Sequence, residues 1–215
     1  MSLVELRLAG HSLRSGSLVA PRFVLCVAFV VCGVWSAGCS NGTTNPSPPA
    51  ASVGLSCGEE RWAVKTLSDP DATRVDFTNV IFTSVAALND LTPHCSNLPE
   101  RRTFPEEFRV FEVTARVSLT RLEDDRDFHI VLVDPANPTK TMITEVVDPE
   151  CQGVAQSPFI LLLAITRNTF QMLSPLVSKT VRLRGVGFYD FSHGQTGRSA
   201  SCIELHPVTR IALAP

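Results

Sequence analysis

The sequence predicts a mainly β domain, in which five strands form a barrel and one helix lies between the third and fourth strands. Three observations support this prediction. From residue 108 onward, apolar and polar residues alternate with a period of two, which is typical of strands with one buried face. Only one stretch of this region, residues 157–176, has the length and apolar content of a helix. Runs rich in Asp, Pro and Gly separate these segments and predict turns.

Each element follows from its local pattern. In the first strand, the apolar residues from Phe111 to Leu119 alternate with polar ones. The acidic run 123–127 and the run 134–138 predict turns on either side of the second strand. Pro175 ends the helix, and we expect Pro207 to kink the last strand. The expected strands are, in chain order, 111–120, 128–132, 141–147, 181–188 and 203–213.

This order of strands and helix is that of an OB-fold, a five-stranded Greek-key barrel. A β-sandwich is the alternative, which the single central helix disfavours. We therefore assign residues 108–215 to an OB-like β-barrel domain.

Residues 57–107 show little periodicity, so we expect an irregular N-terminal extension that wraps the barrel and is not a domain of its own. Within it, residues 61–66 and 75–78 look like short extended segments. Thr83 could cap a short helix over residues 84–90.

The first 38 residues have the pattern of an export signal. Arg7, Arg14 and Arg22 precede the uncharged run 23–35, which is shorter than the ~20 residues that cross a bilayer. A buried core helix is the alternative, but nothing amphipathic accompanies the run. Residues 39–56 are rich in Pro, Ser, Thr and Asn, and we expect them to form a flexible tether.

The sequence Ser36-Ala37-Gly38-Cys39 resembles the lipobox of bacterial lipoproteins. The resemblance implies a signal peptide over residues 1–38 and a lipid on Cys39 that anchors the protein to the membrane of the cell envelope. Since Ser40 stands where an Asp would retain the protein in the inner membrane, we expect the outer membrane if the bacterium is Gram-negative. The alternative is ordinary cleavage nearby, which would release a soluble secreted protein.

Of the seven cysteines, four remain when those of the expected signal peptide and the expected lipidated residue, Cys39, are excluded. An even number in an oxidising compartment predicts disulfides, although the sequence leaves three pairings open. Buried free thiols are the alternative. The spacing contains no Cys-x-x-Cys redox or zinc motif. The disulfide candidates are Cys57, Cys95, Cys151 and Cys202.

Three motifs relate the exported domain to other sequences. They read LEDDxDFHIVL over 122–132, HGQTG over 193–197 and IELHPV over 203–208. Together they resemble an uncharacterised family of exported bacterial proteins, over roughly residues 57–213. The resemblance implies a common fold and no particular activity.

The expected fold brings polar residues to one groove. In OB-folds the loops after the first and fourth strands flank the ligand, and here these are the two most polar stretches, 123–127 and 192–197. Side chains two residues apart on a strand point the same way. The candidate ligand-binding residues are Asp125, Asp127, His129, His193, Gln195, Thr196, Glu204 and His206. Carboxylates and imidazoles suit a divalent cation, whose candidate ligands are Asp127, His129, His193, Glu204 and His206.

These features favour a binding protein over an enzyme. The sequence contains no nucleophile elbow, phosphate-binding loop or zinc-protease motif, and it indicates no cofactor beyond a divalent cation. The leading hypothesis is a membrane-anchored envelope lipoprotein whose barrel binds a small ligand or an envelope protein. The alternative is a metal-dependent hydrolase, of the nuclease or phosphodiesterase kind. Without its first 38 residues the chain has 16 basic and 20 acidic residues and only one Tyr, which disfavours nucleic acid.

Overall fold

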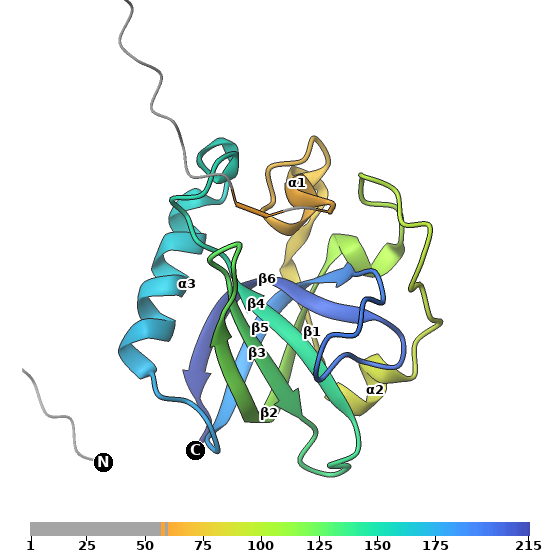
Figure 1. Cartoon of the computed structure of the whole chain (residues 1–215), viewed down its shortest axis with the longest axis vertical. Coiled ribbons are helices and arrows are strands. Elements are labelled where there is room, and N and C mark those ends of the chain that lie inside the picture. The colour runs from red at the N-terminus through yellow and green to blue at the C-terminus, as the bar shows by residue number, and fades with distance from the viewer. Residues whose placement is uncertain (1–56, 59) are drawn as a thin grey trace, which may run out of the picture. The chain divides into compact units, whose positions relative to one another are not determined.

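The computed structural model describes residues 57, 58 and 60–215 (Figure 1). The expected signal peptide, the lipidation of Cys39 and the tether fall outside the described residues.

Six strands of the described chain form one sheet that closes on itself (Figure 1). Their order is β1-β2-β3-β4-β6-β5, and β2 also pairs with β5 over seven registered positions. This second pairing closes the five strands β2 to β6 into a barrel, so the predicted OB-like fold class is confirmed. The strands are β1 Asp76–Thr83, β2 Arg109–Leu122, β3 Phe128–Val133, β4 Thr141–Val146, β5 Thr180–Tyr189 and β6 Ile203–Leu213.

Helices are few and short among the described residues. The α-helices are α1 Trp62–Lys65, α2 Val85–Asn89 and α3 Ile160–Leu173, and the 3-10 helices are η1 Ala72–Arg74, η2 Pro105–Phe108 and η3 Val154–Gln156. None of the helices in this part of the chain has the length and apolar content to cross a membrane.

Alternation of apolar and polar side chains explains the first barrel strand. Val113, Ala115 and Val117 of β2 are fully buried in the core, whereas Thr114 and Arg116 between them are exposed. Strand β6 is instead buried along nearly its whole length, because α3 covers its outer face.

Helix α3 lies between β4 and β5, the third and fourth strands of the barrel, as the sequence predicted. It is shorter than the expected span 157–176, because Pro158 and the 3-10 helix η3 precede it. Thr166 holds it against β6, since its hydroxyl donates to the carbonyl of Thr209 at 2.9 Å.

The segment before the barrel contributes β1, which runs parallel to β2 at the edge of the sheet. The extended segment expected over residues 61–66 is wrong, because Trp62–Lys65 form helix α1. Arg61 adopts a left-handed backbone conformation that turns the chain into this helix, whose Val64 is fully buried. Tertiary burial therefore overrides the local pattern.

A short helix is present near the expected residues 84–90, as α2. Its cap is Ser84, whose hydroxyl accepts a hydrogen bond from the amide of Ala87 at 3.0 Å, and not Thr83 as expected.

Two disulfides join the segment before the barrel to the barrel domain. They are Cys57–Cys151 and Cys95–Cys202, which close loops of 94 and 107 residues. The structure thus selects one of the three pairings that the sequence left open, and the buried-thiol alternative is wrong.

The barrel has a sparsely bonded seam between β4 and β6. These two strands share one registered pair, Thr144 with Leu205, whereas β3 and β4 share six. The hydroxyl of Thr144 adds a bond across the seam, because it donates to the carbonyl of Leu205 at 2.8 Å. Among the described residues, side-chain contacts therefore contribute more than backbone pairing to the closure of the barrel at this seam.

Candidate functional site

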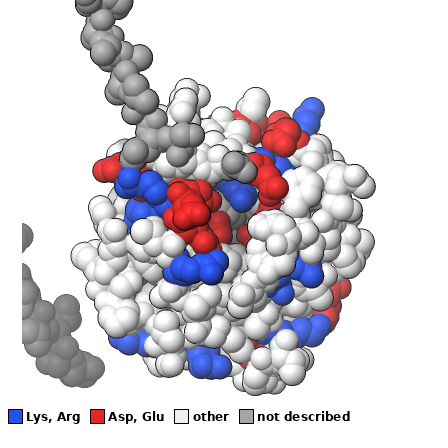
Figure 2. Space-filling model, in the orientation of Figure 1, with Lys and Arg blue, Asp and Glu red and all other residues white. Residues whose placement is uncertain are grey.

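A pocket of about 870 Å³ opens beside the two loops that the sequence predicted to flank a groove. Strands β3, β4 and β6 and the end of α1 supply its inner wall. Figure 2 shows acidic side chains gathered around a hollow on this face of the molecule. Its basic lining residues are Lys65 and Arg121. Its acidic lining residues are Glu60, Glu123, Asp124, Asp125, Glu145, Asp190 and Glu204.

Three strands bring two carboxylates and an imidazole together behind the inner wall of the pocket. Asp127 directly precedes β3, Glu145 lies in β4 and His206 lies in β6. Each offers one ligand atom, and these atoms lie within 4.8 Å of one another. Asp127 and His206 have no exposed area, and of the three only Glu145 lines the pocket. We call these three residues the buried triad.

The facing atoms of the buried triad are poorly satisfied. Nε2 of His206 lies 2.9 Å from Oε2 of Glu145 and 3.5 Å from Oδ2 of Asp127. Nε2 of His206 and Oδ2 of Asp127 nevertheless make no hydrogen bond of regular geometry among the described residues. Leaving such buried groups unsatisfied is costly for a fold.

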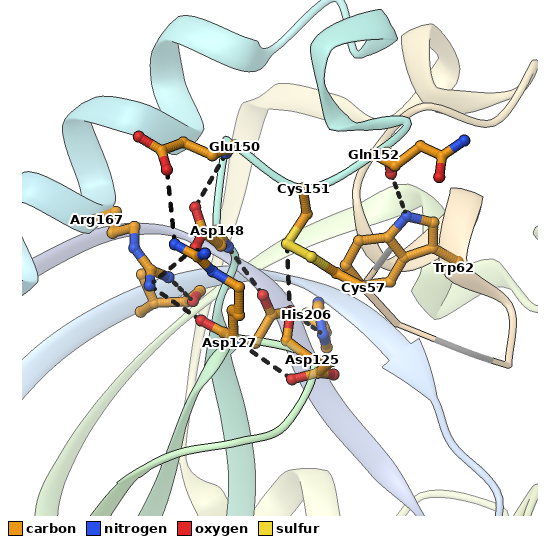
Figure 3. The surroundings of a disulfide bond; sticks show 12 residues. Cys57, Trp62, Asp125, Asp127, Asp148, Glu150, Cys151, Gln152, Arg167 and His206 are labelled. Carbon is orange, nitrogen blue, oxygen red and sulfur yellow. Dashed lines mark hydrogen bonds and ion pairs between the residues drawn. A yellow bond between two sulfur atoms is a disulfide. The ribbon is translucent and has the colours of Figure 1, made fainter. Parts of the chain in front are cut away.

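Each residue of the buried triad is held by its other polar atom. The amide of Asp148 donates to Oδ1 of Asp127 at 2.8 Å (Figure 3). Nδ1 of His206 lies 3.1 Å from the carbonyl oxygen of Lys65. Oε1 of Glu145 lies 3.0 Å from Nδ1 of His129. The three side chains are therefore fixed with Oδ2, Oε2 and Nε2 directed at one another.

Burial and neighbouring charged groups together determine the pKa values of these groups. It raises the pKa of Asp127 well above its ordinary value, and the charges of Asp125 and Glu145 raise it further. Burial alone would also raise the pKa of Glu145, but the imidazoles of His129 and His206 hold it well below its usual range. For His129, burial would lower the pKa, but Glu145 raises it above the ordinary value for an imidazole.

A second group of ligand atoms lies at the mouth of the pocket. Glu60, Asp190 and His193 bring their ligand atoms within 4.8 Å of one another, and Glu60 and His193 are exposed. Nε2 of His193 lies 3.4 Å from Oδ2 of Asp190 and 3.9 Å from Oε2 of Glu60. The amide of Gln195 donates to Oδ2 of Asp190 at 3.0 Å, so this group is partly satisfied within the protein. We call it the exposed triad.

Lys65 and Glu204 place two further charges on the inner wall. The ammonium of Lys65 lies 5.6 Å from the centre of the Phe188 ring. Burial alone would lower the pKa of Lys65, but Asp190, Glu145 and Glu204 raise it above its ordinary value. Burial raises the pKa of Glu204 well above its ordinary value, with the charges of Asp190 and Glu145 adding to the effect. Carboxyl groups therefore outnumber the one buried cation, Lys65, on the inner wall.

The candidate residues from the sequence divide between these groups. Six of the eight line the pocket. One is Asp125, whose Oδ1 also accepts a hydrogen bond from the amide of Asp127 at 3.1 Å. The other five are His129, His193, Gln195, Thr196 and Glu204. Asp127 and His206 lie behind the wall in the buried triad.

The five candidate metal ligands do not form one site. Asp127 and His206 meet in the buried triad, while His193 belongs to the exposed triad. His129 touches the buried triad only through Glu145. Glu204 belongs to neither triad.

Sequence reasoning missed Glu145, which joins the buried triad to His129. It also missed Glu60 and Asp190 of the exposed triad. A signal for Glu145 exists in the sequence, because it is the one charged residue in the predicted strand 141–147. Glu60 and Asp190 carry no such signal, since each lies in an irregular segment that only the fold brings to the pocket.

Comparisons with known proteins add little to this geometry. No family model matches the chain, and no curated protein matches it. Among solved structures, the chain is similar to a crystal structure of the fourth OB domain of the yeast telomere protein Cdc13. The similarity has a TM-score of 0.31 and 14% identity, and it covers 52% of this chain and 79% of that one. At that level it bears on no function, and the OB-like description of this chain rests on its strand order and barrel closure.

Proposed function

We propose that this chain is an exported, lipid-anchored envelope protein whose OB-like barrel binds a small cationic ligand in the acidic pocket. The observation that carries this proposal is the lining of the pocket, where seven carboxylates face two basic side chains. Of the two, Arg121 is already paired with Glu123, and Lys65 is buried among carboxylates. A recess with low-dielectric walls concentrates this excess negative charge and favours a positively charged ligand.

The same charge argues against nucleic acid as the ligand. Phosphate groups would enter a recess in which carboxylates outnumber lysine and arginine, and like charges repel. A molecule with two or more amino groups fits this chemistry, because each ammonium can meet a carboxylate such as Glu123 or Asp190.

The proposed export and lipid anchor are inferred from the N-terminal sequence, and the two disulfides support export. Both disulfides suit an oxidising compartment such as the bacterial envelope. Cys39 is the proposed site of the lipid. Metabolic labelling with palmitate is therefore expected to mark the unmodified chain and to fail for Cys39→Ala, and labelling that persists in the variant would refute the anchor.

Calorimetric titration of the chain tests the pocket, with spermidine as the cationic probe and citrate as the anionic one. We expect spermidine to bind, citrate not to bind, and the affinity for spermidine to fall as salt is raised. Asp190→Asn and Glu123→Gln should each weaken binding. Asp90→Asn is the matched control, because this exposed carboxylate lies outside the pocket. Equal binding of both probes, or equal effects of all three substitutions, would refute the proposal.

A metal-dependent hydrolase is the second candidate, because the buried triad contains ligand types that suit a divalent ion. A phosphodiester would have to reach that ion, yet only Glu145 of the buried triad lines the pocket. Release of nitrophenol from bis(4-nitrophenyl) phosphate, with Mn²⁺ or Zn²⁺ added, is the test. Turnover that disappears in Glu145→Gln would favour the hydrolase over the binding protein.

A further inference from the structure

The buried triad has the arrangement of a metal site in which every ligand is oriented by a partner. Asp127 uses Oδ1 to accept from the amide of Asp148, and Glu145 uses Oε1 to meet His129. Each carboxylate has one other oxygen, Oδ2 of Asp127 or Oε2 of Glu145, and this oxygen is directed at Nε2 of His206. Partners of this kind, which fix a ligand by its second polar atom, surround most metal sites in proteins.

The tautomer of His206 follows from its other contact. Nδ1 faces the carbonyl oxygen of Lys65 at 3.1 Å, and a carbonyl can only accept, so Nδ1 carries the hydrogen. In the neutral imidazole, Nε2 then presents a lone pair to Oε2 of Glu145 and Oδ2 of Asp127. A positive charge between the three atoms relieves their repulsion, and it is either a proton on Nε2, which Glu145 favours at 2.9 Å, or a metal ion, which all three atoms can bind at once.

The spacing suits a small divalent ion. Metal–ligand bonds of 2.0–2.2 Å in a tetrahedron separate the ligand atoms by about 3.3–3.6 Å. From Nε2 of His206, the 3.5 Å to Asp127 lies within this range, and the 2.9 Å to Glu145 is somewhat shorter. One imidazole with two carboxylates is a donor set that Zn²⁺ accepts, whereas Ca²⁺ prefers six or more oxygens.

We propose that Asp127, Glu145 and His206 bind a divalent metal ion, with Zn²⁺ as the best fit, and that the ion closes the seam between β4 and β6. Glu145 and His206 directly follow Thr144 and Leu205, the one registered pair of that seam. An ion held by both residues cross-links the two strands where backbone hydrogen bonds are fewest, and Asp127 extends the link to β3.

This site is independent of the ligand proposed for the pocket. Asp127 and His206 are fully buried and do not line the pocket, so a failure of spermidine binding leaves the metal site intact as a proposal. Glu145 lines the pocket as well, and it offers the route by which the ion enters.

The test uses the mature chain, purified in detergent, stripped of metal with a chelator and titrated with Zn²⁺. We expect one ion per chain, and we expect the midpoint of thermal unfolding to rise with the concentration of Zn²⁺, because the ion binds only the folded state. X-ray absorption of the Zn²⁺-loaded chain should show one imidazole with oxygen ligands at about 2.0–2.2 Å. Failure to bind, or sulfur ligands, would overturn the proposal without any variant.

Substitutions of residues in and near the two triads test which side chains bind the ion. Asp127→Asn, Glu145→Gln and His206→Gln should each lower the affinity for Zn²⁺ by more than 100-fold, with folding checked by circular dichroism. His129→Gln removes a positioning residue and should lower the affinity by about 10–100-fold. His193→Gln is the matched control from the exposed triad and should change nothing. Binding that is lost in His193→Gln but kept in Asp127→Asn would place the ion in the exposed triad and refute the proposal.

Discussion

Two regions of the molecule bury charged side chains, and they do so in opposite ways. Where the segment before the barrel packs on the barrel, each buried cation meets a buried anion. Arg61 lies 2.6 Å from Glu107, and Arg102 lies 3.0 Å from Asp69. At the pocket, buried carboxylates such as Asp127 face other carboxylates and keep oxygens without a hydrogen-bond partner among the described residues.

The difference separates two reasons for burying a charge. A buried ion pair with its hydrogen bonds complete maintains the fold, because removal of one partner leaves the other charged and desolvated. Buried groups of like charge oppose folding, so a sequence that retains them does so for another purpose, of which binding of a cation is the simplest. Substitutions should therefore have opposite effects on stability in the two regions.

The largest effect is expected for Arg61→Met. The guanidinium of Arg61 donates to Glu107, to the carbonyl of Tyr189 at 2.7 Å and to the carbonyl of Pro99 at 2.7 Å. The substitution leaves Glu107 buried without its cation, so we expect the free energy of unfolding to fall by about 3–5 kcal/mol. Urea denaturation followed by circular dichroism measures this loss.

Arg74→Met is the matched control for that experiment. Arg74 also pairs with a carboxylate, Asp71, at 2.9 Å, but its side chain is 63% exposed. Water and salt screen this pair, so we expect little change in the urea midpoint. Losses of similar size in the two variants would remove the distinction between buried and exposed pairs on which the comparison depends.

Removal of either disulfide should have the next largest effect. The two bonds close loops of similar length, 94 and 107 residues, so each double Cys→Ser variant should lose about 2–4 kcal/mol. Their effects on binding should differ, because Cys57 lines the pocket and neither Cys95 nor Cys202 does. Spermidine titration of both variants should show weakening only for Cys57→Ser/Cys151→Ser, and equal weakening would contradict that assignment.

The barrel could be predicted from the sequence because its determinants are local. Alternation from Phe111 to Leu119 defines β2, and the turns 123–127 and 134–138 separate the next strands. Helix α1 could not be predicted, because its four residues are helical only through the turn at Arg61 and the burial of Val64.

The site could be predicted only in part, for a similar reason. The two flanking loops and Asp127, His129 and His206 follow from the fold class and the period of the strands. Glu145 completes the buried triad only because β4 and β6 lie side by side at the seam, and neither strand's own sequence indicates a pairing between residues 61 positions apart.

A smaller effect of opposite sign is expected for Glu204→Gln. Glu204 is 2% exposed, and it makes no ion pair among the described residues. The isosteric amide cannot ionise, so it avoids the negative charge that Asp190, Glu145 and burial disfavour at Glu204. We expect the free energy of unfolding at neutral pH to stay level or to rise, because the amide needs no proton to avoid a buried negative charge. A loss comparable with that of Arg61→Met would show that the pocket carboxylates stabilise the fold, contrary to the comparison.

The smallest effect concerns Asp134, a buried carboxylate that backbone amides satisfy without a cation. Its oxygens accept from the amides of Ala86 at 2.8 Å, Ala136 at 2.9 Å and Asn137 at 3.0 Å. Burial alone would raise the pKa of Asp134, but these three bonds hold it below its ordinary value. A pKa that is lower in the folded chain contributes stability above pH ~4, and this stability is lost as the pH falls through the folded pKa.

Asp134→Asn removes that contribution, because the neutral amide binds the start of α2 less strongly than the carboxylate does. We expect the variant to lose about 0.3–1 kcal/mol at neutral pH, the usual effect of a negative charge at a helix N-terminus. The difference from the unmodified chain should shrink below pH ~4, because the carboxyl of Asp134 takes up a proton first in the unfolded chain and, at lower pH, in the folded chain. Urea denaturation at several pH values measures this convergence. A difference in unfolding free energy that does not depend on pH would mean that the shape of the Asp134 side chain, and not its charge, stabilises the fold. In that case the three amide donors would not explain how a buried carboxylate is stabilised without a cation.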